Sequence, residues 1–244
     1  MGKYYYDLHI HSCLSPCGDA DMTPANIAGM AAVAGLQIAA LTDHNTTDNC
    51  PAFWEACKTH GIIPVPGVEL TTAEEIHLLC LFRDLETAME FGTHIAAARL
   101  PARNRPDIFG RQLVMDHTDQ VLREEDAFLL GATTLSLEEG TALCRSLGGV
   151  CMPAHIDREA NGVISVLGTF PADLGYTSYE VSPAADRQEL ERQHPQLGGL
   201  FCVTNSDAHY LWDISGAENS VELQDEPYSS ARVRENLLVA LEGK

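Results

Sequence analysis

Seven short β-type runs that alternate with helical stretches limit what this chain can fold into more than any other feature. Runs rich in valine, isoleucine, leucine and aromatic residues cover residues 4–10, 37–42, 62–70, 75–82, 148–155, 178–181 and 199–206. Strands separated by helices are typical of a parallel sheet with crossover helices. The sequence therefore predicts an α/β fold, a distorted seven-stranded (β/α)7 TIM-like barrel.

The helical stretches and the chain length favour one domain. The first helix is expected to have Thr23 as N-cap and Pro24 at its first position, and to end at Gly35. A chain of 244 residues fits a single barrel. Segment 101–134 breaks the pattern and predicts a hairpin with a turn at residues 117–119, inserted between the fourth strand and its following helix. We expect one domain over residues 1–244, with this segment over the barrel mouth, where loops set specificity.

Ionisable residues gather at the strand ends. They are His9 and His11 on the first strand, Asp43 and His44 after the second, Glu69 on the third, His77 on the fourth, His155 at the end of the fifth, and Asp207 and His209 after the last. The ends of parallel barrel strands meet at one rim, where such folds place their active sites. These residues are therefore candidates for a single site.

Their chemistry favours transition metals. Two residues apart on a strand, His9 and His11 point to the same side and can grip one cation. An isolated pair of this kind is more often two half-exposed histidines than a metal site. The histidines and carboxylates at the other strand ends favour the metal site here. Imidazoles mixed with carboxylates suit manganese, zinc or iron better than calcium or magnesium. So many candidate ligands predict two or three divalent ions that share a bridging carboxylate.

Other catalytic arrangements have weaker support. Ser12 and Ser206 do not lie in a GxSxG turn, and Cys13 and Cys17 lack a signature of thiol catalysis. A GxxxxGK loop and a GxGxxG turn after the first strand are both missing from the sequence.

The net charge of −20 argues against long polyanions, because binding without a basic face gives up the attraction to phosphates. Bound divalent cations would reverse the sign of charge inside a pocket. The N-terminal residues lack a signal-peptide pattern, and residues 27–42 predict a helix followed by a strand rather than a membrane span. Cysteines in apolar runs and the absence of a CxxC pair indicate a reducing compartment. We expect a cytoplasmic protein without stable nucleic-acid or membrane binding.

Six segments together resemble a known family. DLHIHS, LTDHN, GVEL, EIHLLCLF, PAHIDR and NSDAH are similar, in this order, to the successive motifs of the PHP (polymerase and histidinol phosphatase) family of amidohydrolase-like barrels. The resemblance covers residues 6–209 apart from segment 101–134. It implies a PHP-type barrel and a metal-dependent phosphoesterase.

The resemblance also implies a ligand set. One ion would be held by His9, His11, Glu69 and Asp207, and Glu69 would bridge to a second ion held by His77 and His155. A third ion would take His44, His209 and an early ligand. The family has an SDG-like turn at that point, whereas this chain has HSCLSPCGDADMTP. Counting back from Pro24 favours Asp19, and Cys17 is the alternative.

The implied activity is hydrolysis of a phosphate ester by a metal-activated hydroxide, with Glu69, Asp207 and His209 as catalytic residues. Arg158 is a candidate for binding the substrate phosphate, and Asp43 for orienting a ligand histidine. The favoured substrate is a small-molecule or nucleotide phosphomonoester. The alternatives are a phosphodiesterase or exonuclease acting on nucleotides, and a non-catalytic PHP module. The sequence leaves the substrate open, because the contacts that choose among phosphate esters lie in loops, and it also leaves the oligomeric state open.

Overall fold

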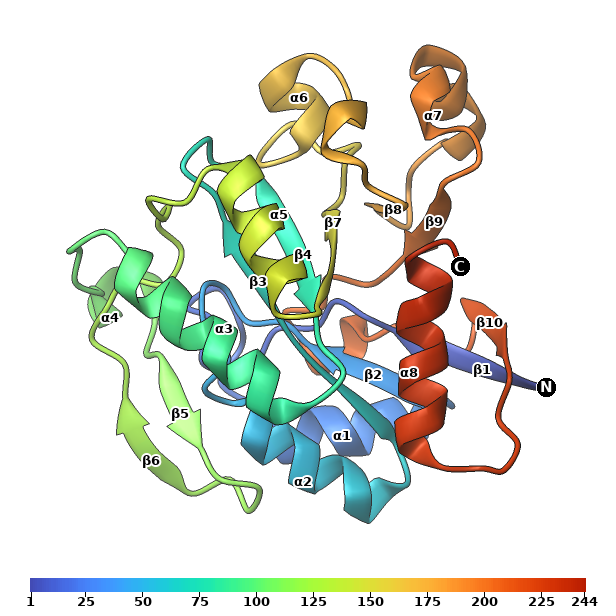
Figure 1. Cartoon of the computed structure of the whole chain (residues 1–244). Helices are drawn as coiled ribbons and strands as arrows, with labels where there is room; N and C mark the ends of the chain where they lie inside the picture. The colour runs from blue at the N-terminus through green and yellow to red at the C-terminus, as the bar shows by residue number, and fades with distance from the viewer.

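A curled six-stranded sheet forms the centre of the molecule, in a computed structural model that describes all residues from 1 to 244 (Figure 1). The strands are β1 (Gly2–Asp7), β2 (Ile38–Leu41), β3 (Ile63–Thr71), β4 (His77–Leu81), β5 (Leu113–Met115), β6 (Val121–Glu124), β7 (Val150–Pro153), β8 (Ser178–Val181), β9 (Phe201–Thr204) and β10 (Ser220–Leu223). The α-helices are α1 (Pro24–Val33), α2 (Cys50–His60), α3 (Leu85–Ala98), α4 (Pro106–Phe109), α5 (Leu137–Ser146), α6 (Val163–Leu167), α7 (Arg187–Gln193) and α8 (Ser230–Leu241). Three 3₁₀ turns complete the chain: η1 (Ala172–Leu174), η2 (Pro195–Leu197) and η3 (Leu211–Asp213).

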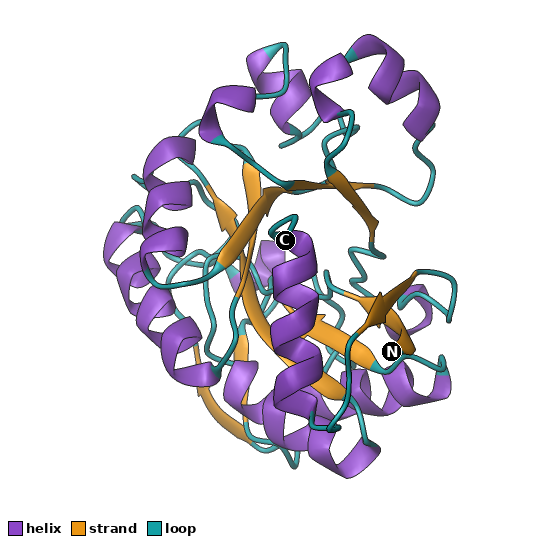
Figure 2. Ribbon diagram, turned by 45° about the vertical axis from the view of Figure 1, so that its right-hand side comes forward, coloured by secondary structure: helices purple, strands orange, loops and turns teal.

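The order of the central sheet is β10-β1-β2-β3-β4-β7, and β8 and β9 form a separate parallel pair. Single contacts join the two sheets. Ile156 donates its N–H to the carbonyl of Glu180 at 2.9 Å, and His11 donates to the carbonyl of Ala208 at 3.0 Å. The strands therefore curl around one interior, as Figure 2 shows, without a continuous hydrogen-bonded ring.

Each of the seven predicted strands overlaps an observed one, and the α/β class is confirmed. The predicted barrel of seven parallel βα units is not observed, because the central sheet is mixed and has six strands. β4 pairs antiparallel with both β3 and β7, because only the short turn at residues 72–76 joins β3 to β4, and a parallel pairing needs a crossover of a dozen residues or more. Strand β10, which pairs antiparallel with β1, is not among the strands predicted from the sequence.

Alternation along the strands divides the core into inner and outer layers. The inner residues include Tyr4, Tyr6, Ile38, Ala40, Ile63, Val65, Leu79, Leu81, Val150 and Met152. They pack against the apolar face of α8, formed by Val233, Leu237, Leu238 and Leu241. On the outside, α1 and α2 cover β2, while α3 and α5 cover β3, β4 and β7. Helix α8 thus fills one end of the barrel interior and leaves the other end to polar side chains.

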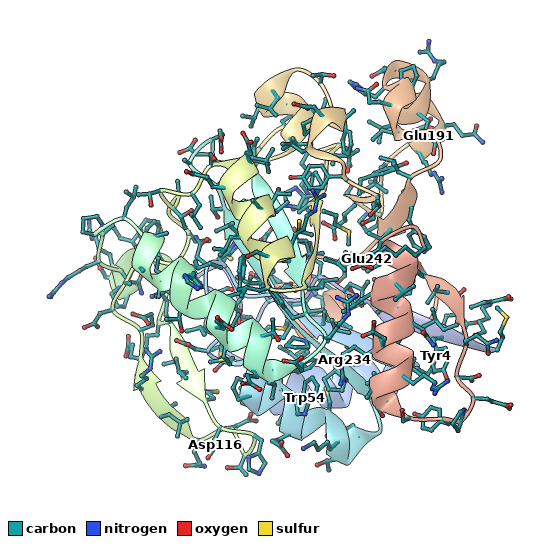
Figure 3. All side chains as sticks on the ribbon, in the orientation of Figure 1. Tyr4, Trp54, Asp116, Glu191, Arg234 and Glu242 are labelled. Carbon is teal, nitrogen blue, oxygen red and sulfur yellow. The ribbon has the colours of Figure 1, made fainter.

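A buried arginine fastens α8 to its neighbours. The guanidinium of Arg234 lies 4.3 Å from the ring centroid of Trp54 on α2, and Figure 3 shows the two side chains together. It donates to the carbonyls of Arg83 and Pro64 at 2.6 and 3.1 Å. This contact combines a cation–π interaction with hydrogen bonds that replace lost water.

Segment 101–134 contains the predicted hairpin, with β5 and β6 antiparallel and Asp116 at its turn (Figure 3). The side chain of Asn49, just before α2, accepts from the N–H of Met115 at 2.9 Å and donates to the carbonyl of Leu113 at 3.0 Å. The segment follows α3 and precedes α5, so the expected position before the helix that follows the fourth strand is wrong. Through Met115 and Asn49 the segment packs against the loop before α2, on the flank of the rim.

None of the helices of the chain has the length and apolar character needed to cross a bilayer.

Candidate metal centre

The predicted site residues meet at the open end of the barrel. His9 and His11 follow β1, Asp43 and His44 follow β2, Glu69 lies near the end of β3, His155 follows β7, and Asp207 and His209 follow β9. His77 is the first residue of β4 and pairs with Thr71 at the end of β3. Because β4 runs against β3, the start of this strand reaches the rim where the others end.

The carboxylate of Glu69 is at the centre of the group and is 1% exposed. Its Oε1 lies within 3.3 Å of three imidazole nitrogens: His77 Nδ1 (2.7 Å), His155 Nε2 (3.0 Å) and His9 Nε2 (3.3 Å). Its Oε2 faces two more: His44 Nδ1 (3.0 Å) and His11 Nε2 (3.3 Å). One carboxylate therefore separates the histidines into two sets, which is the position of a bridging ligand.

Three overlapping groups of donor atoms are close enough to hold a cation each. They are His9, His11, Glu69 and Asp207; His44, Glu69 and His77; and His11, His44 and His209. His155 adjoins the second group, since its Nε2 is 3.3 Å from His77 Nδ1. The structure thus brings together every predicted ligand except Asp19.

The facing nitrogens of His9 and His11 indicate that cations belong here. Their Nε2 atoms are 3.1 Å apart, while His9 Nδ1 contacts the carboxylate of Glu180 and His11 Nδ1 contacts the hydroxyl of Ser15. With each Nδ1–H donated outward, both Nε2 atoms present lone pairs to each other. Only a cation between them, a proton or a metal ion, removes that repulsion.

Buried polar atoms without partners support the same conclusion. His44 Nδ1, Glu69 Oε2 and Asp207 Oδ1 are buried and make no hydrogen bond. His44 Nδ1 and Glu69 Oε2 are nevertheless 3.0 Å apart, which is close enough to bond but not aligned to do so. Unpaired buried acceptors are costly, and coordination of a metal would satisfy them. The residues present therefore fit the metal ions that the motifs imply.

The ionisation states match this role. Burial lowers the pKa of His44 to about 3 and that of His209 to about 4, so both are neutral and able to bind metal. Burial also disfavours a charge on His11, but the carboxylates of Asp207 and Glu69, 3.0 and 3.3 Å from its Nε2, raise its pKa to about 9. Burial raises the pKa of Glu69, but the imidazoles packed around its carboxylate, with His77 and His9 foremost, bring it well below the usual range. The carboxylates therefore favour positive charge in the centre, which bound metal ions would supply.

Glu180 on β8 is a functional residue that the sequence reading missed. Both of its carboxylate oxygens lie 3.0 Å from His9 Nδ1. It also accepts from the Asn205 amide at 2.7 Å and from the N–H of His155 at 2.9 Å. A carboxylate that holds the outer nitrogen of a ligand histidine fixes its tautomer and orientation. The available signal was an acidic residue inside the strand-like run SYEV.

Asp43 acts through neighbours. It accepts from the hydroxyl of Ser15 at 2.7 Å, and Ser15 in turn contacts His11 Nδ1 at 3.1 Å. It also accepts from both the N–H and the hydroxyl of Ser12 at 2.7 Å. These contacts link Asp43 through Ser15 to His11 and through Ser12 to the loop after β1.

Asp19 and Cys17, the two candidates for the early ligand, differ in their position relative to the pocket. Oδ1 of Asp19 accepts the N–H of Asp21 at 2.9 Å, a turn contact, and the side chain joins none of the donor groups. Its backbone N–H donates to the carbonyl of His209 at 2.9 Å, which holds the loop against the site. Cys17 is exposed and lines the pocket above the centre. Geometry therefore favours Cys17 over Asp19 as the nearer side chain.

The pocket at the rim has a volume of about 370 Å³ and opens onto Glu69, His77 and Asp207. Arg158 is on its wall and forms an ion pair with Asp207 Oδ2. Leu130 brings segment 101–134 to the same wall. His155 and Asp207 have positive φ angles of 29° and 51°, which non-glycine residues rarely adopt and which often mark functional sites. The space is suited to one small group beside the metal ligands.

A curled α/β barrel with histidines and carboxylates converging at its rim defines a metal-dependent hydrolase. The PHP domain model matches residues 7–231, and the chain belongs to the PHP family. The resemblance of the six motifs is thereby confirmed. Members of this family hydrolyse phosphoesters, and the chain is a metal-dependent PHP hydrolase.

One relative by sequence is the 5′-3′ exoribonuclease Rnm of Salmonella typhimurium, 35% identical over 85 residues that make up 33% of this chain and 28% of the relative. The chain thus spans under a third of that protein. The lesion-specific endonuclease EndoQ of Pyrococcus furiosus has a similar structure, with a TM-score of 0.70, 18% identity and coverage of 99% of this chain and 56% of EndoQ. A candidate metal-dependent phosphoesterase of Bifidobacterium adolescentis gives a TM-score of 0.63 and 19% identity, with coverage of 95% of both chains.

These relatives overturn one expectation. The acidic net charge predicts no stable nucleic-acid binding, but the proteins similar to this chain include an exoribonuclease and an endonuclease whose structure was solved with a 27-mer duplex. Charge summed over the whole chain does not describe the potential at a site where cations bind. The expectation of no nucleic-acid binding is wrong.

Proposed function

We propose that this chain is a phosphodiesterase that releases nucleotides from an end of a nucleic acid, at a centre of three transition-metal ions. The observation that carries the proposal is the convergence of five histidines with Glu69 and Asp207 in three overlapping donor groups, with His155 beside them, around one small pocket. The exoribonuclease relative supports the choice of nucleic acid. A pocket of about 370 Å³ is in the range of small-ligand sites and favours a strand end over the middle of a long chain.

Each residue has a distinct part in the proposal. His9, His11 and Asp207 would hold one ion, His77 and His155 a second, and His44 and His209 a third, with Glu69 as the bridge. When bound, such ions polarise the phosphate and lower the pKa of a water, which supplies hydroxide at neutral pH. Manganese, iron or zinc would suit these mixed nitrogen and oxygen donors.

Arg158 would contact the substrate phosphate. Its guanidinium forms an ion pair with Asp207 on the pocket wall, and its side chain is 43% exposed. A guanidinium offers five N–H donors, so the contact with Asp207 leaves others for a phosphate. Asp207 thereby links a metal site to a phosphate site.

A small phosphomonoester is the second candidate substrate. The limited volume of the pocket would also suit such a substrate. Protein supplied with manganese, iron or zinc is incubated with 5′-phosphorylated RNA and DNA oligonucleotides and with a panel of phosphomonoesters. We expect stepwise release of nucleotides, abolished in Glu69→Gln. Hydrolysis of monoesters alone would replace the first candidate by the second.

A further inference from the structure

Two exposed aromatic rings are stacked directly after a ligand histidine. Tyr210 and Trp212 follow His209, with ring centroids 5.0 Å apart and ring planes at 17°. Trp212 is 75% exposed and Tyr210 is 41% exposed. Large aromatic side chains are usually buried or at interfaces, so an exposed, stacked pair beside the metal centre is a candidate ligand-binding surface.

The backbone holds the pair in place at the rim. His209 lines the metal pocket, and its carbonyl accepts the N–H of Asp19 at 2.9 Å. In η3, Asp213 donates its N–H to the carbonyl of Tyr210 at 3.0 Å, and Leu211 packs on the core beneath α1. Three residues of chain span at most about 10 Å, so the Trp212 backbone stays within that distance of His209.

Stacking also suits the charge of this protein. With 35 acidic and 15 basic residues, the chain can offer little attraction to a run of phosphates. Aromatic rings bind unpaired bases of any sequence through their faces, without a basic groove. An acidic nuclease would therefore gain affinity from bases and leave the phosphate to the metal ions and Arg158.

We propose that Tyr210 and Trp212 form a stacking platform for unpaired bases of a single-stranded nucleic acid whose end lies in the metal pocket. This inference rests on the proposed nuclease function and names the strand type and the residues that select it. The open face of Trp212 takes a base next to the nucleotide in the pocket, and Tyr210 supports the indole from its other face.

Kinetics of Trp212→Ala, Tyr210→Ala and Trp212→Phe test the platform with the metal-loaded enzyme, on single-stranded oligonucleotides and on a small chromogenic phosphodiester. Loss of the indole should raise the KM for oligonucleotides about tenfold and leave kcat and all small-ester kinetics unchanged, with partial rescue by phenylalanine. Tyr228→Ala, which removes a tyrosine that is 65% exposed at the α8 end of the molecule, serves as the control and should change nothing. An unchanged KM in Trp212→Ala, with cleavage intact, would overturn the platform and spare the nuclease function.

Binding is measured separately from cleavage with a phosphorothioate oligonucleotide that resists hydrolysis. It should quench tryptophan fluorescence in the wild type but not in Trp212→Phe, which retains Trp54 as the only tryptophan. An abasic strand of the same length should not quench. If the base-containing strand quenches the fluorescence but the protein cleaves no oligonucleotide, the stacking platform is supported and the proposed nuclease function is refuted. Equal quenching by normal and abasic strands would overturn base stacking.

Discussion

Glu180 accepts the Nδ1–H of His9 with both carboxylate oxygens at 3.0 Å, and this contact aims His9 Nε2 at the metal centre. Glu180→Gln should lower metal content and reduce turnover about 10- to 100-fold, as is typical for partners of ligand histidines. The carboxylate of Glu180 accepts hydrogen bonds from the Asn205 side-chain amide and the His155 N–H. The NH2 group of a glutamine would face one of these donors and could not accept from it. Elemental analysis and steady-state kinetics check this. Glu222→Gln, at an exposed position on β10, is the matched control, and equal behaviour of the two variants would contradict the role.

Glu69→Gln should lose more than one equivalent of metal and all measurable turnover. Glu69 faces five imidazole nitrogens within 3.3 Å, and the substitution removes its negative charge from between cations. Far-ultraviolet circular dichroism should remain close to that of the wild type. Near-normal turnover with full metal content would show that Glu69 is not a bridge.

Asp19→Ala should keep its full metal complement, contrary to the sequence-based assignment of Asp19 as a ligand. Its carboxylate bonds the N–H of Asp21 and joins no donor group. Cys17→Ala provides the comparison, because this side chain lines the pocket. Metal analysis of both variants decides between them. Loss of one equivalent in Asp19→Ala alone would restore the original assignment.

The metal-free protein should lose stability as the pH rises from about 6.5 to about 9. His11 has a folded-state pKa raised from 6.5 to about 9 by Asp207 and Glu69, against the opposing effect of burial. A group whose pKa is raised in the folded state stabilises the fold fully at pH values below its unfolded-state pKa. That stabilisation disappears as the pH rises through the folded-state pKa. Urea denaturation at several pH values, with and without metal, checks this. An equal or steeper loss of stability in the metal-loaded protein would contradict it, because metal should displace these protons.

Leu238→Ala should reduce the free energy of unfolding by about 2–5 kcal/mol, since Leu238 is fully buried where α8 fills the barrel. Leu122→Ala removes a side chain that is 65% exposed on β6 and should cost little. Urea denaturation of both variants gives the comparison. A small effect at Leu238 would mean that α8 is not part of the core.

Local sequence was enough to predict the strands and most of the centre. The apolar runs define each strand because a strand in a closed core must be hydrophobic on its buried faces. The spacing of His9 and His11, the end positions of His44 and His155, and the pair Asp207 and His209 are all local patterns. Their meeting at one rim followed from the general geometry of barrels.

Three features became apparent only in the folded structure. The direction of β4 depends on the turn before it and on pairing with β7, and this placed His77 at the rim from the start of its strand. Glu180 is 171 positions from His9, and no local pattern links a buried glutamate in β8 to a histidine after β1. The stack of Tyr210 on Trp212 is visible only once η3 is folded.

The sequence by itself therefore determined which residue types could bind metal and on which strands they occur, because hydrophobic period and motif spacing are properties of short segments. The tertiary structure alone decided which atoms face one another: the five nitrogens around Glu69, the contact of Glu180 with His9, and the position of Asp19 outside the donor groups. The physical reason is that side-chain distances of about 3 Å depend on strand direction and register, which are set by pairing energies summed over the whole sheet.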